Sequence, residues 1–260
     1  MGLKDKLIKL KVTGPCVGHN RFLNLRNIER LVKKDPYATF GINNLGSLHP
    51  SEVLQSIASI TGCSADIKLI EGTGFIKPEA SARGLKEAAA ILSSLKKDSK
   101  VLMATGHPGS LIGFYLEVGR FLRNRCQLLT TDEQIEVNRF RCPDCGTHDD
   151  IHWIDFIEEV AFVTDGDVGL HVHSPEPMAK LIDAVGIPDL VLADHGFVGE
   201  AVNRKIPAFT FMDTNDPVLA VAKARGDNIT IIPMDDNRGN AVSAKVGKLL
   251  VDIINERSKG

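Results

Sequence analysis

Two patterns of apolar positions divide the chain near residue 98. In the first part, residues 1–98, apolar residues recur at helical spacing between polar stretches. The pattern predicts helices over 22–34, 50–62 and 78–96. Glycine-containing polar segments at 41–49 and 64–77 indicate loops. The N-terminal portion is therefore expected to be mainly helical.

From residue 99 to 260, short apolar runs alternate with helical patterns. This alternation is typical of βαβ units around a parallel sheet. The predicted strands are Val101–Thr105, Gln127–Thr130, Glu159–Thr164, Gly169–His173, Leu190–Asp194, Ala208–Asp213 and Thr230–Met234. The predicted helices are 110–124, 176–185, 196–204, 217–225 and 239–256. We expect one α/β domain over 1–260 with a doubly wound, mostly parallel sheet.

Two departures from a purely parallel sheet are expected. Asp165-Gly166-Asp167 lies between two predicted strands and is a tight-turn signal, which predicts an antiparallel hairpin there. Residues 140–153 form a small insertion with its own hairpin.

The charge balance narrows the class of partner. The chain has 31 Lys and Arg against 33 Asp and Glu, and the two signs are interspersed, which argues against nucleic-acid and membrane binding. No apolar run approaches the roughly 20 residues of a membrane span, and Met1–Lys6 lacks the apolar core of a signal peptide. We expect a cytoplasmic protein with a small-molecule partner, and the sequence leaves both a monomer and a homo-oligomer open.

The cysteines form no disulfide framework. Cys16, Cys63 and Cys126 stand alone and are expected to be reduced and mostly buried. Cys142 and Cys145 form a C-x-x-C pair, which a redox function would place at a helix start after a strand rather than in a loop. The alternative to an ordinary loop is a structural zinc site that staples the hairpin. Its ligands would be Cys142, Cys145, His148 and His152.

A candidate anion site follows the first predicted strand. Gly106, His107, Gly109 and Ser110 open a helix, whose free N–H groups and dipole could hold a phosphate. The segment has neither the Lys-Ser/Thr pair of a Walker loop nor the three glycines of the dinucleotide fingerprint. The competing interpretation is a Gly-Pro turn with Ser110 as an ordinary N-cap.

Histidines and aspartates follow later strands. His171 and His173 are two positions apart, so on a strand both would point to one face as a pair of metal ligands. The alternative is that one imidazole is buried and bonded to the backbone. Asp194 and His195 end another apolar run, and a carboxylate beside an imidazole suits metal or acid–base chemistry. The alternative is that Asp194 caps a helix beginning near Phe197 while His195 is solvated.

Two more acidic groups end the last strands. Asp213 and Asp235 are the functional candidates, whereas Asp216, Asp236 and Asn237 are expected to act as caps. Ligands from several strands would converge on the crevice where open α/β sheets bind ligands. Imidazoles with carboxylates suit Mn²⁺, Zn²⁺, Fe²⁺ or Mg²⁺. The predicted metal ligands are His171, His173, Asp194, His195, Asp213 and Asp235.

A phosphate binder also needs a cation. Arg21 and Arg26, in a polar start of the first long helix, are the candidates, with Arg21 assigned to substrate binding. The alternative is that both lie on a solvated helix face.

These motifs as a set resemble a bacterial family known generically as phosphatases. The resemblance runs from 13 to 237 and rests on Thr-Gly-Pro, Asn-Leu-Arg, Ala-Thr-Gly-His-Pro, His-Ser-Pro-Glu-Pro-Met, Ala-Asp-His-Gly-Phe, Asn-Asp-Pro and Asp-Asp-Asn. It implies phosphatase activity but does not identify the substrate. It singles out Gly106, His107, His173, Asp194, His195, Asp213 and Asp235. The cysteine-bearing insertion departs from the family pattern.

Residues 188–254 are also similar to the end of the ribosomal protein S-two family. That family has a flavodoxin-like fold, so the resemblance implies a Rossmann-like or flavodoxin-like sheet. Ribosome binding is not implied, because the rest of the chain differs and no basic surface is indicated.

The sequence thus predicts a metal-dependent phosphohydrolase of a small phosphorylated metabolite. A divalent ion (Mn²⁺, Zn²⁺ or Mg²⁺) would activate water, the 106–110 loop would hold the phosphate, and His107 or His195, with Asp194, would supply proton transfer. Two alternatives stay open at this point: a metal-free sugar-phosphate isomerase or lyase, and a non-catalytic phosphometabolite-binding protein.

Overall fold

The computed structural model describes residues 1–15, 19–138, 151–257 and the backbone of 141–142 and 146–147. Its centre is a sheet with five main parallel strands. These are β1 (Lys100–Ala104), β7 (Val160–Thr164), β8 (Leu190–Leu192), β9 (Ala208–Met212) and β10 (Ile229–Pro233). They lie in the order β10-β9-β8-β1-β7, which is the flavodoxin-like order 2-1-3-4-5 in chain sequence. The predicted doubly wound α/β fold is confirmed.

The sheet is extended beyond these strands. The short β2 (Gln127–Leu128) pairs with the start of β1, while β6 (His152–Ile157) and β3 (Ile135–Val137) add antiparallel strands beyond β7. In the insertion, β4 (Arg141–Cys142) and β5 (Gly146–Thr147) pair antiparallel, so the predicted small hairpin is also present.

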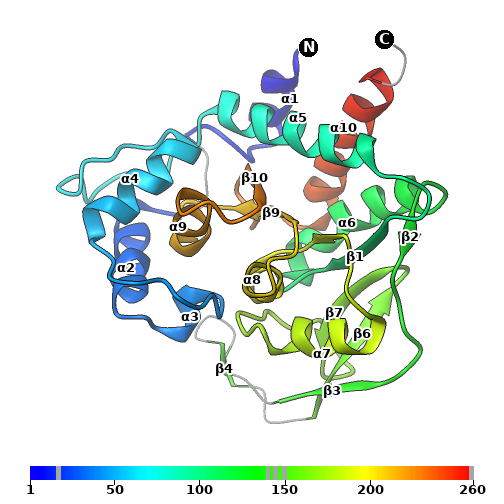
Figure 1. Ribbon diagram of the computed structural model, residues 1–260. Helices are drawn as coiled ribbons and strands as arrows, with labels where there is room; N and C mark the ends of the chain where they lie inside the picture. Colours follow the sequence, from blue (N-terminus) through cyan, green and yellow to red (C-terminus); the bar gives the residue numbers. More distant parts are fainter. Residues whose placement is uncertain (16–18, 139–140, 143–145, 148–150, 258–260) are drawn as a thin grey trace.

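Side-chain alternation in the strands creates two cores. In β1, Leu102 and Ala104 face one side of the sheet, and Val101 and Met103 face the other. One core is covered by α2 (Arg21–Val32), α3 (Pro36–Thr39), α4 (Pro50–Thr61), α7 (Glu176–Val185), α8 (His195–Asn203) and α9 (Pro217–Ala224). The other is covered by α1 (Leu3–Lys9), α5 (Pro78–Ser94), α6 (Pro108–Leu122) and α10 (Asn240–Arg257). The N-terminus and the last turn of α10 lie on the same side of the molecule, beside α5 (Figure 1).

Local sequence signals set the helix boundaries. Helices α4, α5, α6 and α9 begin with proline at a first-turn position, where the missing N–H leaves no bond unmade. Helix α4 ends at Gly62, whose φ of +74° is the left-handed conformation that glycine adopts at helix ends. The predicted loops 41–49 and 64–77 contain no helix and no strand of the sheet.

The strand predicted at Gly169–His173 is wrong, and the hairpin predicted at Asp165-Gly166-Asp167 is reduced to a turn with one antiparallel bridge between Thr164 and Gly169. At this bridge the Leu170 N–H donates to the Val163 carbonyl at 2.8 Å. Beyond it the segment leaves β7, and the Val172 N–H donates instead to the carbonyl of Gly106. The hairpin in the sheet is instead β6–β7, which turns at Glu158 and Glu159.

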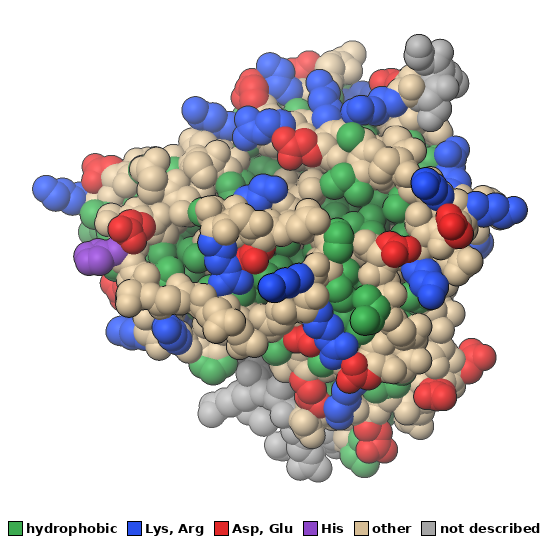
Figure 2. Space-filling model, viewed as in Figure 1, with side chains coloured by type: hydrophobic (Ala, Val, Ile, Leu, Met, Phe, Trp, Pro, Cys, Tyr) green, Lys and Arg blue, Asp and Glu red, His purple; other side chains and the backbone are tan. Residues whose placement is uncertain are grey.

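The surface fits the predicted charge balance. On the face seen in Figure 2, Lys and Arg side chains are interspersed with Asp and Glu side chains. Within the described ranges, no helix has both the length and the apolar character that crossing a membrane requires. Of the described cysteines, Cys126 is buried and Cys63 is half-buried, both as free thiols.

Candidate functional site

A cavity of about 650 Å³ opens at the carboxyl ends of the parallel strands. It is lined by residues that follow β1, β8, β9 and β10, and it is closed on one side by α2 and α3. Strand order reverses between β1 and β8, and this switch point is where doubly wound sheets leave a crevice for ligands. The fold therefore brings the polar strand ends together as the sequence predicts.

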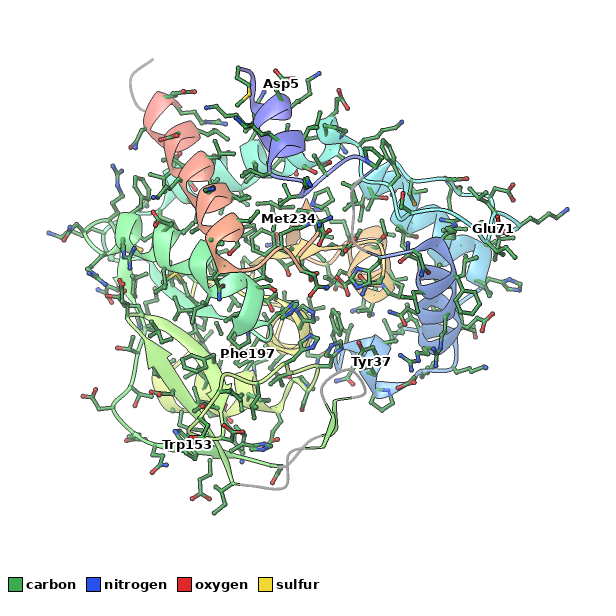
Figure 3. The ribbon with its side chains drawn as sticks, turned by 180° about the vertical axis from the view of Figure 1, so that it is seen from behind. Asp5, Tyr37, Glu71, Trp153, Phe197 and Met234 are labelled. Atoms are coloured by element: carbon green, nitrogen blue, oxygen red, sulfur yellow. The ribbon has the colours of Figure 1, made fainter. Side chains whose placement is uncertain are left out.

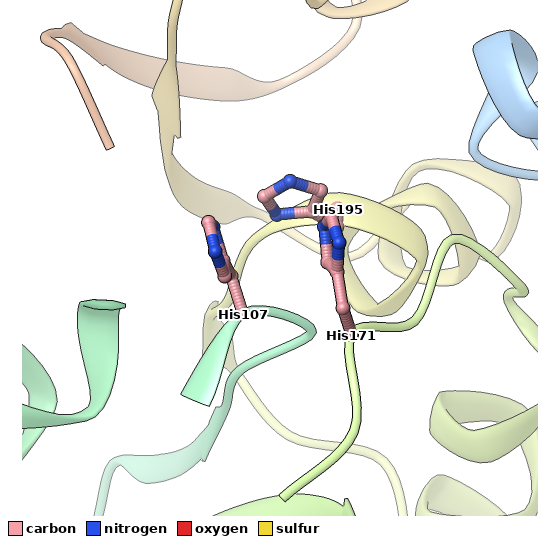
Figure 4. A group of neighbouring side chains, drawn as sticks. All are labelled: His107, His171 and His195. Carbon is pink, nitrogen blue, oxygen red and sulfur yellow. The ribbon is translucent and has the colours of Figure 1, made fainter. Parts of the chain in front are cut away.

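Three imidazoles converge in this cavity. One ring nitrogen from each of His107, His171 and His195 lies within 4.8 Å of the others. Figure 4 shows the three rings pointing towards one another from three segments: the loop after β1, the loop after β7 and the start of α8. With His173 we call them the histidine cluster. Three such nitrogens at this spacing are a donor set that could hold a divalent metal ion.

His173 is held in place by α3. Its Nδ1 donates a hydrogen bond to the carbonyl of Tyr37 at 2.8 Å, and its ring stacks on the Tyr37 ring with 3.9 Å between centroids. Seen from behind, Tyr37 lies near the centre of the molecule (Figure 3). The His173 Nε2 lies 3.1 Å from the Nε2 of His171. Two nitrogens bound to one tetrahedral zinc ion would be about 3.3 Å apart, so this spacing suits a shared ion.

His195 is held by the neighbouring carboxylate. Its Nδ1 lies 2.8 Å from Asp194 Oδ1, and the same oxygen accepts a hydrogen bond from the Gly106 N–H at 2.9 Å. His195 has a φ of +49°, a strained backbone conformation for a residue with a side chain. A Cβ at Gly196 would come within 2.2 Å of the Ser174 carbonyl oxygen, so glycine is needed where these segments meet.

Asp194 itself is turned away from the cavity. It is 1% exposed, and its Oδ2 is buried close to the buried hydroxyl of Tyr115. Burial, followed by the nearby Asp194 charge, raises the pKa of Tyr115 well above its usual value. Asp194 stands at the N-cap position of α8 but makes no capping hydrogen bond, and His195 is buried rather than solvated. The structure thus places Asp194 as the residue that orients His195.

The protonation of the imidazoles differs across the cluster. Burial, and then the charge of His195, lowers the pKa of His171 and of His173 far below the usual value, so both are neutral. Burial also lowers the pKa of His195, but the hydrogen bond and charge of Asp194 outweigh it and raise that pKa to about 9. Neutral imidazole is the form that binds a metal ion.

A second group of ligands follows β9 and β10. Carboxylate oxygens of Asp213, Asp235 and Asp236 lie within 4.8 Å of one another, and the residues are 0%, 0% and 4% exposed. We call these three residues the aspartate cluster. Burial, and then the charge of Asp216, raises the pKa of Asp236 well above its usual value. Asp236 lines the cavity, so the expectation that it serves only as a helix cap is wrong.

Asp216 and His19 belong to the same half of the cavity. Asp216 is at the N-cap position of α9, but its carboxylate accepts no capping bond from the helix and instead accepts the Asp213 N–H at 3.0 Å. The predicted capping role is therefore wrong. Burial raises the Asp216 pKa to about 6. His19 Nδ1 lies 2.7 Å from Asp213 Oδ2; burial lowers the His19 pKa, but Asp213 outweighs this and raises it to about 9.

The predicted anion loop is only partly available. The N–H groups of Gly106 and Ser110 are used within the protein, by Asp194 and by the His107 carbonyl. Gly109 is exposed and lines the cavity beside Pro108. Helix α6 begins at Pro108 with His107 at its N-cap position, so Ser110 is not an N-cap. The first turn of α6, at Gly109, is the part of this loop that faces a ligand.

The two candidate arginines have different places. Arg21 is 3% exposed and donates to the carbonyls of Leu69 and Asp66, each at 2.9 Å, so it fixes the 64–77 loop and does not line the cavity. Arg26 is exposed and lines the cavity, as does Arg30 one turn later on α2. The cations that face the cavity therefore come from Arg26 and Arg30.

Of the four suspected zinc ligands, only His152 has a described side chain. Cys145, His148 and the side chain of Cys142 lie outside the described residues, so the structural zinc site stays a prediction. His152 is described and is fully buried at the start of β6.

The predicted strand-end residues gather around one cavity, and the residues that the sequence missed are of two kinds. His19 and Tyr37 reach the cavity from the N-terminal helices, for which the sequence carries no motif. Asp216 and Asp236 did carry the signal of a polar residue after a buried strand. The capping interpretation competed with that signal, because a strand end and a helix start coincide at both positions.

Comparison with known proteins places the chain in a family. The sequence model of the family described as Phosphatase matches residues 1–255. A curated relative named Phosphatase SCO2771, from Streptomyces coelicolor, is 28% identical over 244 residues, which cover 90% of this chain and 88% of the relative. No solved structure matches the chain. Since the family model covers nearly the whole sequence, the chain belongs to the Phosphatase family.

Proposed function

We propose that the protein is a phosphohydrolase that acts on a small phosphorylated metabolite and requires a divalent metal ion. The observation that carries the proposal is the convergence of ring nitrogens from His107, His171 and His195 in the cavity at the strand switch point. Membership of the Phosphatase family supports the hydrolase class. A cavity of about 650 Å³ supports a small substrate.

The residues present fit a metal ion. His173 and His195 each have Nδ1 held by an oxygen, from Tyr37 and Asp194, which leaves Nε2 for a ligand role. Metal-binding histidines typically have such a partner on the other ring nitrogen. We assign His171 and His195 of the three converging histidines as ligands, together with His173, whose Nε2 lies 3.1 Å from that of His171. An ion bound there would lower the pKa of water and neutralise phosphoryl charge.

The remaining residues would bind the substrate and move its proton. Arg26 and Arg30 lie at the cavity wall, where guanidinium groups can pair with phosphate oxygens. The exposed first turn of α6, at Gly109, faces the same space with the positive end of the helix dipole. His107 begins this turn beside the cluster, so we assign it to protonate the leaving oxygen.

Release of inorganic phosphate tests the proposal. Purified protein loaded with Mn²⁺ would be incubated with a panel of sugar phosphates, nucleotides and other phosphate monoesters, beside a His171→Ala variant. We expect phosphate release from at least one substrate class by the parent protein and none above background by the variant. Equal release by both proteins would rule out the histidine cluster as the site. Tight binding of a phosphorylated compound without any release would favour the non-catalytic binding protein.

A further inference from the structure

The aspartate cluster is a second group of buried carboxylates, and it meets the same cavity through Asp236. Asp213, Asp235 and Asp236 are at least 96% buried, and one oxygen from each lies within 4.8 Å of the other two. Burying carboxylates together is unfavourable unless they are paired with cations. The partners of these three side chains therefore decide what the cluster can hold.

Two of the three carboxylates are already oriented by the protein. Asp213 accepts hydrogen bonds from the Thr214 N–H and from His19 Nδ1. Asp235 accepts the Asn237 N–H at 3.0 Å and pairs with the Arg238 guanidinium at 2.7 Å. Hydrogen bonds and ion pairs of this kind fix the carboxylates that ligate metal ions.

Asp236 differs from both. Its side chain is 5% exposed and lines the cavity, yet within the described part of the chain no hydrogen bond reaches its carboxylate. The Nε2 of His195 is 3.8 Å from Asp236 Oδ2, which is beyond hydrogen-bond distance. A buried carboxylate that faces the cavity without a hydrogen-bond donor is suited to a cation from solution.

Asp236 also connects the two clusters. It lies within 4.8 Å of Asp213 and Asp235 on one side and 3.8 Å from a histidine-cluster nitrogen on the other. In two-metal hydrolytic sites the ions are about 3.5–4 Å apart and act on both the attacking and the leaving oxygen. A carboxylate that touches both ligand groups is placed to bridge such a pair.

We propose that the cavity is a two-metal centre in which the aspartate cluster holds a second divalent ion and Asp236 bridges it to the ion of the histidine cluster. The proposal rests on the proposed function for its first ion. The imidazole-rich position suits Zn²⁺ or Mn²⁺, whereas the oxygen-rich position suits Mn²⁺ or Mg²⁺. Mn²⁺ can therefore occupy both positions.

Mn²⁺ stoichiometry and magnetic resonance test this. Chelator-stripped protein would be dialysed against Mn²⁺, and bound metal would be measured together with the electron paramagnetic resonance spectrum. Thiolates such as those of Cys142 and Cys145 are poor ligands for Mn²⁺, so the hairpin should not add to the number of Mn²⁺ ions measured per chain. We expect two Mn²⁺ per chain and the spectrum of an exchange-coupled pair.

Single substitutions separate the two positions. Asp235→Asn removes charge from the second position only, so we expect one Mn²⁺ per chain with an isolated six-line spectrum. Asp236→Asn should abolish the coupling. Asp252→Asn, an exposed carboxylate on α10, is the matched control and should keep two coupled ions. Circular dichroism and thermal unfolding would verify that each variant is folded, and Asp213→Asn replaces Asp235→Asn if the latter is not.

One Mn²⁺ per chain in the parent protein at saturation, or two Mn²⁺ without exchange coupling, would overturn the proposal. These outcomes are distinct from failure of the proposed function. A protein with one ion that releases phosphate would keep the hydrolase assignment and lose the second site. A protein with two coupled ions that hydrolyses no phosphate ester would do the reverse.

Discussion

The histidine cluster lines the cavity and the aspartate cluster meets it through Asp236, and the two clusters are built in different ways. The histidines come from three loops on the β1, β7 and β8 side of the switch point, and their rings are held by a carbonyl and a carboxylate. The aspartates follow β9 and β10 and are held by backbone N–H groups and by His19 and Arg238. One crevice thus offers a nitrogen-rich half and an oxygen-rich half. The same kind of substitution should therefore change metal binding differently in the two halves.

The largest effect is expected from removing a ligand of the histidine cluster. His171→Ala leaves no replacement for a nitrogen 3.1 Å from His173 Nε2, so metal-dependent phosphate release should fall to background. The measurement is turnover at saturating Mn²⁺. His49→Ala, an exposed histidine at the start of α4, is the control and should keep full activity. Wild-type turnover by His171→Ala would show that the histidine cluster does not hold the catalytic metal ion.

The next effect belongs to the proton donor. His107→Gln keeps a polar side chain at the N-cap position of α6 but cannot protonate a leaving oxygen, so kcat should fall about 10²- to 10⁴-fold. Esters with a good leaving group need less protonation and should lose much less. A loss that is equal for good and poor leaving groups would argue against this role.

A smaller effect on metal binding is expected from Asp194, which orients the His195 ring. Asp194→Asn keeps an oxygen for the His195 ring but removes the charge that orients it, so Mn²⁺ affinity should fall about 10- to 100-fold. The measurement is Mn²⁺ titration of the stripped protein. The corresponding change on the other side, Asp235→Asn, should alter the number of ions bound rather than the affinity of the first. Unchanged affinity in Asp194→Asn would show that Asp194 is not needed to position His195.

The smallest effect on catalysis concerns the cavity wall. Arg26 is exposed, so Arg26→Ala should raise KM by up to about tenfold, which is the lower end of a charged hydrogen bond. Arg21→Ala should leave KM unchanged and lower the melting temperature, because it loses bonds to two carbonyls that cost about 1–3 kcal/mol when unmade. Kinetics and thermal unfolding of the two variants check both statements. The opposite pattern would restore Arg21 as the substrate cation.

The sequence predicts the parallel core well because each strand carries a local signal. Leu190–Asp194 and Ala208–Asp213 are buried apolar runs that end in acidic residues, and each of these aspartates is hydrogen-bonded to a histidine that lines the cavity. Gly169–His173 carries a similar signal but pairs with β7 only at Gly169 and Leu170, after which the Val172 N–H bonds to the carbonyl of Gly106. The partner that a segment's N–H groups find is a tertiary property that a local pattern does not contain.

The missed site residues have a related cause. His19 and Tyr37 reach the cavity only because α2 and α3 fold over the strand ends, about which neighbouring residues in the sequence say nothing. Asp216 stands where a helix begins, so a cap and a cavity residue look alike. Its orientation towards the Asp213 N–H is decided by packing.

A single titration tests whether phosphate release depends on a bound divalent metal ion. A Cys142→Ser/Cys145→Ser variant, which removes the suspected zinc site, would be stripped with chelator and titrated with Mn²⁺ while bound metal and phosphate release are followed together. The account predicts no release from the stripped protein and recovery of activity in step with Mn²⁺ binding. Full activity in the stripped protein, or Mn²⁺ binding that leaves phosphate release unchanged, would contradict it.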